Sequence, residues 1–174
     1  PVQAIIDAQL DAAAARADWI VEAVVEQIDA KRALHARVDA ARKPGSIVSS
    51  NTSGIPIGSI AAGRSADFQA HFLGTHFFNP PRYLKLLEMI PSARTDSEVL
   101  RVMTAFAQTR LDKTVVLCKD TPNFIANRIG AFVGQVRLHA AIAHGLSVEE
   151  VDALTGPLIG NPKTGTFRLA DLIG

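Results

Sequence analysis

Cysteine is nearly absent from this chain, since Cys118 is the single one among 174 residues. One cysteine excludes an internal disulfide framework and fits a reducing compartment. The chain also has no strong excess of positive or negative residues, because 18 Lys and Arg residues and 17 Asp and Glu residues leave a formal net charge of +1. Without a basic cluster there is no reason to expect a nucleic-acid partner. No apolar run approaches membrane-spanning length, and no basic-then-apolar signal opens the chain, so we expect a cytoplasmic protein with no membrane partner.

The composition that remains is that of a soluble globular protein, with 48% hydrophobic and 20% charged residues. Short apolar or β-branched runs alternate with helix-compatible segments up to about residue 118, and helical segments alone follow. This order predicts an open α/β sheet over residues 1–118 and the start of an all-α domain over residues 119–174. We expect no metal site.

The expected elements follow from periodicity and from residues that begin or end helices. Strands are expected at residues 18–25, 46–50, 72–78, 84–90 and 114–118. Helices are expected at residues 26–42, 56–62, 95–109, 122–144, 147–154 and 167–173, after a weak helix or loose arm at 1–17. Capping boxes at Thr95 and Ser147 should begin two of these helices, and Asp120 followed by Pro122 should cap the helix at 122–144.

Two apolar runs in the segment 71–90, HFLGTHFFNPPRYLKLLEMI, flank a turn that contains tandem prolines. Prolines cannot donate to a strand ladder, so the break between the two strands is well marked. Side chains alternate along the second run, and both of its faces are largely apolar, as in a strand that is covered on each side. Glu88 is therefore expected among aliphatic neighbours.

A carboxylate in such surroundings is costly unless it is paired, and His76 at the end of the preceding run is the nearest partner. A carboxylate that bonds an imidazole fixes its tautomer, which suits a general base. The alternative is a surface histidine before a turn and an edge glutamate that faces water.

Polar residues follow three successive strands, at the positions where an open α/β sheet binds its ligands. They are Glu26, the turn residues 51–53, and His76 with Asn79. The alternative is that Glu26 is only a favourable carboxylate at a helix start and that residues 51–53 are only a turn.

The sequence THFFNPPRYLKLLEMI at residues 75–90 closely resembles the catalytic segment of the L-3-hydroxyacyl-CoA dehydrogenases, which oxidise 3-hydroxyacyl-CoA with NAD in fatty-acid β-oxidation. The resemblance implies that His76 is the general base and that Glu88 orients it. It also implies that Asn79 lies beside the nicotinamide.

The resemblance extends to about residues 18–174. ADWIVEAVVEQIDAKRAL is similar to the family segment that carries cofactor contacts, which places them on Glu26 and Lys31. SSNTSG resembles the turn whose serine, here Ser53, contacts both the nicotinamide side and the substrate. KDTPNFIANRI resembles the start of the helical domain, where Asn127 is the substrate-contacting amide and Asn123 stands where many members have Gly.

As a whole, the resemblance implies a Rossmann-type domain, NAD as cofactor, an acyl-CoA substrate and a homodimer formed through the helical domain. The forms NPPRYLKLLE, TPNFIANRIG and NPKTGTFRLADLIG are most similar to long bacterial members that also carry an enoyl-CoA hydratase-type domain.

The G-x-G-x-x-G turn that should open a dinucleotide-binding domain does not occur in the 174 residues. We therefore expect an interior fragment that lacks the first strands of its domain. By itself it should neither bind NAD usefully nor oxidise substrate, and it should tend to self-associate. Two alternatives stay open: an NADP-dependent β-hydroxyacid dehydrogenase, or a non-catalytic assembly or dimerisation module that uses the apolar helix at 122–144.

Overall fold

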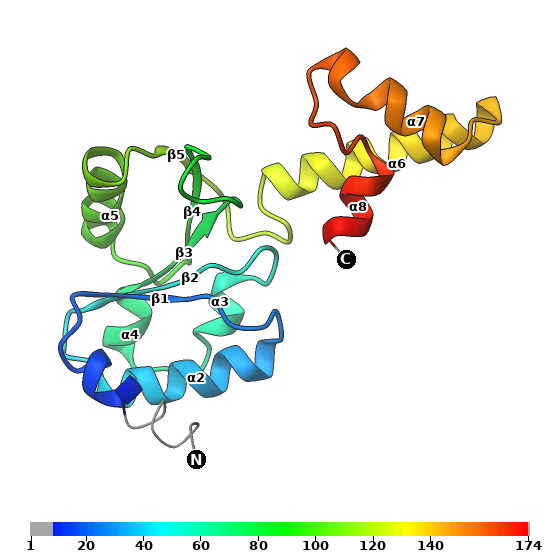
Figure 1. Ribbon diagram of the computed structural model, residues 1–174. Coiled ribbons are helices and arrows are strands. Elements are labelled where there is room, and N and C mark those ends of the chain that lie inside the picture. The colour runs from blue at the N-terminus through cyan, green and yellow to red at the C-terminus, as the bar shows by residue number, and fades with distance from the viewer. Residues whose placement is uncertain (1–8, 174) are drawn as a thin grey trace. The chain divides into compact units, whose positions relative to one another are not determined.

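A computed structural model describes residues 9–173 and contains two compact units, the first ending at Ile125 and the second beginning at Ala126 (Figure 1). Residues 9–14 of the predicted N-terminal helix or arm are helical, and residues 1–8 lie outside the described part. Among the described helices, none combines the length and apolar character that crossing a membrane requires.

The first unit is built on a five-stranded sheet with the strands in chain order. Its strands are β1 Trp19–Glu22, β2 Ile47–Ser50, β3 Phe72–Phe77, β4 Leu86–Pro91 and β5 Thr114–Leu117. All neighbouring pairs are parallel except β3 and β4, which are antiparallel on either side of the proline turn. The predicted open α/β sheet is thus confirmed, with a first strand shorter than residues 18–25.

Helices cover both faces of this sheet (Figure 1). Helices α2 Ile28–Ala41, α3 Ile57–Ile60 and α4 Ala66–Ala70 cover one face, around a core that includes Val48, Phe68, Phe72 and Ile90. Helix α5 Ser97–Arg110 covers the other face and packs against Leu73, Leu87 and Met89. The sequence did not predict α4, because five residues are too few for a helical periodicity to appear.

Gly74 of β3 lets α3 approach the sheet closely. A Cβ atom at this position would lie 2.8 Å from Ile57 Cδ1 and 3.0 Å from Ile90 Cδ1, so a larger residue would force these side chains to move.

The second unit contains α6 Ala126–His144, α7 Val148–Thr155, the 3₁₀-helix η1 Pro157–Ile159 and α8 Phe167–Ile173. The capping box at Ser147 is confirmed, since its hydroxyl accepts from the Glu150 amide and the Glu150 carboxylate accepts from the Ser147 amide. Asp152 caps α8 by accepting the Phe167 amide at 2.6 Å.

Two predicted helix starts are wrong. Helix α5 is capped by Asp96, which accepts from the Glu98 amide, whereas the Thr95 hydroxyl donates to the Phe72 carbonyl oxygen of the adjacent strand. Helix α6 begins at Ala126 rather than at 122, because Asn123 and Phe124 have φ angles of 62° and 47° and cannot continue a right-handed helix. Asp120 instead caps α3, where it accepts the amides of Ile57 and Gly58.

Candidate active site

His76 and Glu88 face each other across the antiparallel β3–β4 pair, where they are register partners. His76 Nδ1 lies 2.8 Å from Glu88 Oε2, and both side chains are buried. The predicted contact between these two residues is confirmed. An ionised carboxylate only accepts, so Nδ1 carries the hydrogen and Nε2 is the ring nitrogen that can take a proton.

The remaining surroundings of this pair fix its position. Glu88 Oε1 accepts the Ile125 amide at 3.1 Å, so each carboxylate oxygen is held by a donor. The rings of Phe78 and Phe124 lie 4.4 and 5.9 Å from the imidazole centroid. Burial, and then the nearby Glu88 carboxylate, raise the pKa of Cys118 to about 12, so this thiol stays protonated. The His76–Glu88 pair therefore lies in a largely apolar shell, beside a thiol that carries no charge.

Glu26 lies beyond the end of β1 and bonds to the turn that follows β2. Its Oε1 accepts the Thr52 hydroxyl at 2.5 Å, the Ser53 amide at 2.8 Å and the Gly54 amide at 3.3 Å. Burial would raise the pKa of Glu26, but these bonds and the ammonium group of Lys31 outweigh it and lower the pKa. Glu26 is thus more than a carboxylate at a helix start, because it fixes the turn that carries Ser53.

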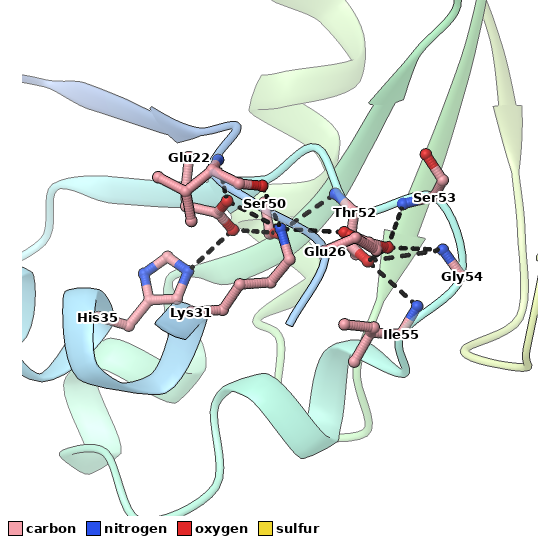
Figure 2. A network of polar contacts seen from close by, with 10 residues as sticks. Glu22, Glu26, Lys31, His35, Ser50, Thr52, Ser53, Gly54 and Ile55 are labelled. Carbon is pink, nitrogen blue, oxygen red and sulfur yellow. Dashed lines mark hydrogen bonds and ion pairs between the residues drawn. The ribbon is translucent and has the colours of Figure 1, made fainter. Parts of the chain in front are cut away.

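Lys31 lies inside the first unit, with 1% of its side chain exposed. Its Nζ is 2.9 Å from Glu22 Oε1, 3.1 Å from Glu26 Oε2 and 3.2 Å from the Val24 carbonyl oxygen (Figure 2). An ammonium group has three donors, and these three acceptors match them. Lys31 therefore joins the end of β1 to Glu26, and its predicted contact with a cofactor stays a prediction.

Asn51 connects this turn to the strand that carries the histidine. Its Oδ1 accepts the Phe77 amide at 2.9 Å, and Phe77 directly follows His76. Asn79 is exposed just beyond the end of β3, and Ser53 is exposed on the turn after β2. The first unit thus brings Glu26, Ser53, His76 and Asn79 to the carboxyl ends of three neighbouring parallel strands.

Asn127 lies in the first turn of α6, within the second unit, and is half-buried there. Among residues 9–173 no group of three His, Cys, Asp or Glu side chains could hold a metal ion.

Sequence reasoning missed Glu22, which pairs with Lys31, and also Ser50 and His35, which contact Glu22. One signal was available, because Glu22 is the lone carboxylate inside the apolar run WIVEAVV, as Glu88 is inside KLLEMI. Such a carboxylate needs a partner, and Lys31 is the cation that supplies it.

An open α/β sheet with polar residues at the carboxyl ends of its parallel strands and a buried histidine–carboxylate pair beside them has the arrangement of a ligand-binding α/β domain. Residues 2–121 match the family model described as 3-hydroxyacyl-CoA dehydrogenase, NAD binding domain, and the chain belongs to this family. The resemblance found in the sequence is thereby confirmed.

Relatives agree with this membership. A probable 3-hydroxyacyl-CoA dehydrogenase of Bacillus subtilis is 59% identical over 158 residues, which cover 91% of this chain and 20% of that protein. A relative of the same description from Deinococcus radiodurans is 49% identical, over 90% of this chain and 45% of its own length. The crystal structure of FadB2 from M. tuberculosis superposes with a TM-score of 0.84 at 33% identity, covering 95% of this chain and 57% of that one. The chain therefore spans about a fifth to a little over half of these proteins.

Proposed function

We propose that this chain forms part of an NAD-dependent L-3-hydroxyacyl-CoA dehydrogenase, which oxidises the 3-hydroxyl group of an acyl-CoA to a 3-oxo group in fatty-acid β-oxidation. The observation that carries the proposal is the buried 2.8 Å contact between His76 Nδ1 and Glu88 Oε2. It leaves Nε2 as the proton acceptor, which is the role that oxidation of an alcohol requires.

The residues at the strand ends fit the nicotinamide half of such a cofactor. Ser53 is an exposed residue on a turn that three bonds to Glu26 hold in place. Glu26 keeps 44% of its side chain exposed in spite of these bonds, so it can still accept from a ribose hydroxyl group. Glu26, Lys31, Ser53 and Asn79 are the residues that would hold the cofactor, with Lys31 supporting Glu26.

The proposed reaction separates a proton from a hydride. NAD, when bound, accepts the hydride from C3 of the substrate. His76 Nε2 takes the proton of the 3-hydroxyl group as the carbonyl forms, so both electrons of the broken C–H bond leave with the hydride. Glu88 stabilises the charged imidazole and holds its orientation. Ser53 and Asn127 would position the substrate oxygen atoms by hydrogen bonds.

Replacing the base tests this mechanism. The variant is made in the longest natural polypeptide that contains these residues, which is called the parent below. In this parent, His76→Gln should lower kcat by about 10²- to 10⁴-fold, the usual contribution of a general base. His71→Gln is the matched control, because His71 precedes β3 at the other end of the strand and bonds the Asp67 carbonyl oxygen. Turnover of the His76 variant within threefold of the parent would remove this residue from the role.

The second unit supports a proposed homodimer. Helix α6 exposes an apolar row whose members include Ile129, Phe132 and Val136, with Phe132 69% exposed. Exposed apolar surface of this kind is typical of an interface between proteins. Light scattering of the natural protein that contains this chain should report a dimer, and the Phe132→Glu variant of that protein should be a monomer. A monomeric parent protein would contradict the proposal.

The 174 residues by themselves are expected to bind NAD weakly, since they lack the glycine-rich turn. Titration calorimetry with NAD tests this expectation, and a low micromolar Kd would overturn it.

A further inference from the structure

Glu22 is a buried carboxylate at the end of β1 that the proposed reaction does not use. Each of its oxygens has two partners (Figure 2). Oε1 accepts the Val24 amide at 2.6 Å and lies 2.9 Å from Lys31 Nζ, whereas Oε2 accepts the Ser50 hydroxyl at 2.5 Å and lies 3.5 Å from His35 Nε2. Burial would raise the pKa of Glu22, but the contact with His35 and the bonds from Ser50, Lys31 and the Val24 amide lower it to about 2.

Two chains of bonds lead from Glu22 to the turn that carries Ser53. The first passes through Lys31 to Glu26, whose Oε1 accepts the Ser53 amide. The second passes through Ser50, because the Ser50 hydroxyl group donates to Glu22 and accepts the Thr52 amide at 3.3 Å. Both chains end on consecutive backbone amides of the same turn.

Charge and burial make Glu22 the fixed end of the first chain. The Lys31 ammonium is enclosed by protein, so it requires an ionised partner that is equally enclosed. Glu22 meets this requirement, with 2% of its side chain exposed, whereas Glu26 keeps 44% exposed and water competes for it. Without the charge of Glu22, Lys31 would keep Glu26 as its charged partner and the Val24 carbonyl oxygen as a neutral one, and the geometry of Glu26 toward the turn would change.

We propose that Glu22 is a positioning residue that holds Ser53 in place for the nicotinamide and the substrate, acting through Lys31 and Ser50 without touching either ligand. The ligands named here rest on the proposed function. The coupling of Glu22 to the turn does not, and it has a measurement of its own.

The coupling is tested without any ligand by hydrogen exchange. In Glu22→Gln the isostere keeps the volume but removes the charge, so the Ser53 and Gly54 amides should exchange about tenfold faster. Asp67→Asn is the matched control. It removes an exposed carboxylate that pairs with the enclosed guanidinium group of Arg42. Arg42 also bonds the Ser46 carbonyl oxygen, so this pair lies at the opposite ends of the strands from Ser53. Equal exchange at Ser53 and Gly54 in Glu22→Gln and the parent would overturn the proposal.

The consequence for the ligand is tested by binding and kinetics in the longest natural polypeptide. Glu22→Gln should raise the Kd and KM for NAD about tenfold while kcat falls by less than threefold, because His76 and Glu88 keep their contact. Asp67→Asn should leave both constants within twofold of the parent, even where its unfolding midpoint falls. A loss of kcat without a change in the Kd for NAD would also overturn the proposal.

A gentler variant keeps the test informative if Glu22→Gln does not fold. Ser50→Ala removes one donor to Glu22 and leaves its charge paired with Lys31, so we expect a rise of about threefold in the Kd for NAD and in Thr52 amide exchange. If neither rises, the proposal is wrong. A parent that binds NAD with a Glu22-dependent Kd but does not oxidise 3-hydroxyacyl-CoA would refute the proposed function and leave the positioning role standing.

Discussion

Glu88→Gln tests how much of the proposed chemistry depends on one carboxylate. The wild-type side chain accepts bonds from His76 Nδ1 at 2.8 Å and from the Ile125 amide at 3.1 Å on its two different oxygens, and it is buried. A glutamine at this position has one acceptor oxygen and one NH₂ group, so it can serve only one of the two donors.

Either orientation of the new amide has a cost. If its oxygen stays with the Ile125 amide, the NH₂ group faces His76 and selects the tautomer with hydrogen on Nε2, which can no longer accept the substrate proton. If the amide flips, the Ile125 N–H group loses its acceptor, which costs about 1–3 kcal/mol of unfolding free energy. In both cases the negative charge that stabilises the imidazolium is lost.

We therefore expect kcat to fall by about 10²- to 10⁴-fold, the scale of a lost general base, and stability to fall by no more than about 3 kcal/mol. The assay is steady-state oxidation of 3-hydroxyacyl-CoA by the longest natural polypeptide, with urea unfolding in parallel. Glu98→Gln is the control, because Glu98 forms an exposed pair with Arg101 on α5. A Glu88→Gln enzyme that folds and turns over within threefold of the parent would refute this assignment.

Further predictions concern stability and reactivity. The pKa of Glu22 is lowered to about 2 in the folded state, so the ionised carboxylate adds to the free energy of unfolding in full above about pH 4.5, and this stabilisation is lost as pH falls toward 2. The free energy of unfolding, measured as a function of acid pH, should show this loss in the parent and not in Glu22→Gln. With its pKa raised to about 12, Cys118 should react slowly with a disulfide reagent at pH 8 until urea unfolds the protein, and rapid labelling of the native state would contradict this. Gly74→Ala should cost about 1–3 kcal/mol by crowding Ile57 and Ile90, and a calorimetric midpoint equal to that of the parent would show that this contact relaxes freely.

Strand positions and the His76–Glu88 contact were predictable from the sequence because their causes are local. A carboxylate inside an apolar run must find a partner, and the proline turn between two short strands brings His76 opposite Glu88. The capping box at Ser147 was equally local, since both of its bonds join residues three apart.

The starts of helices α5, at Ser97, and α6, at Ala126, were decided in part by distant contacts. Thr95 and Asp120 are both suitable N-cap residues in sequence. However, the first donates to the carbonyl oxygen of Phe72 and the second accepts the amides of Ile57 and Gly58, residues far away along the chain. A capping group can serve only one helix end, and packing determines which one it meets.

Tertiary structure alone decided the surroundings of Lys31. The sequence shows a lysine on a helix, which would ordinarily extend into water. Packing of α2 against the ends of β1 and β2 instead encloses its ammonium group between Glu22 and Glu26. A buried cation persists only where the fold supplies ionised partners from other elements, and no periodicity in the chain records which carboxylate that will be.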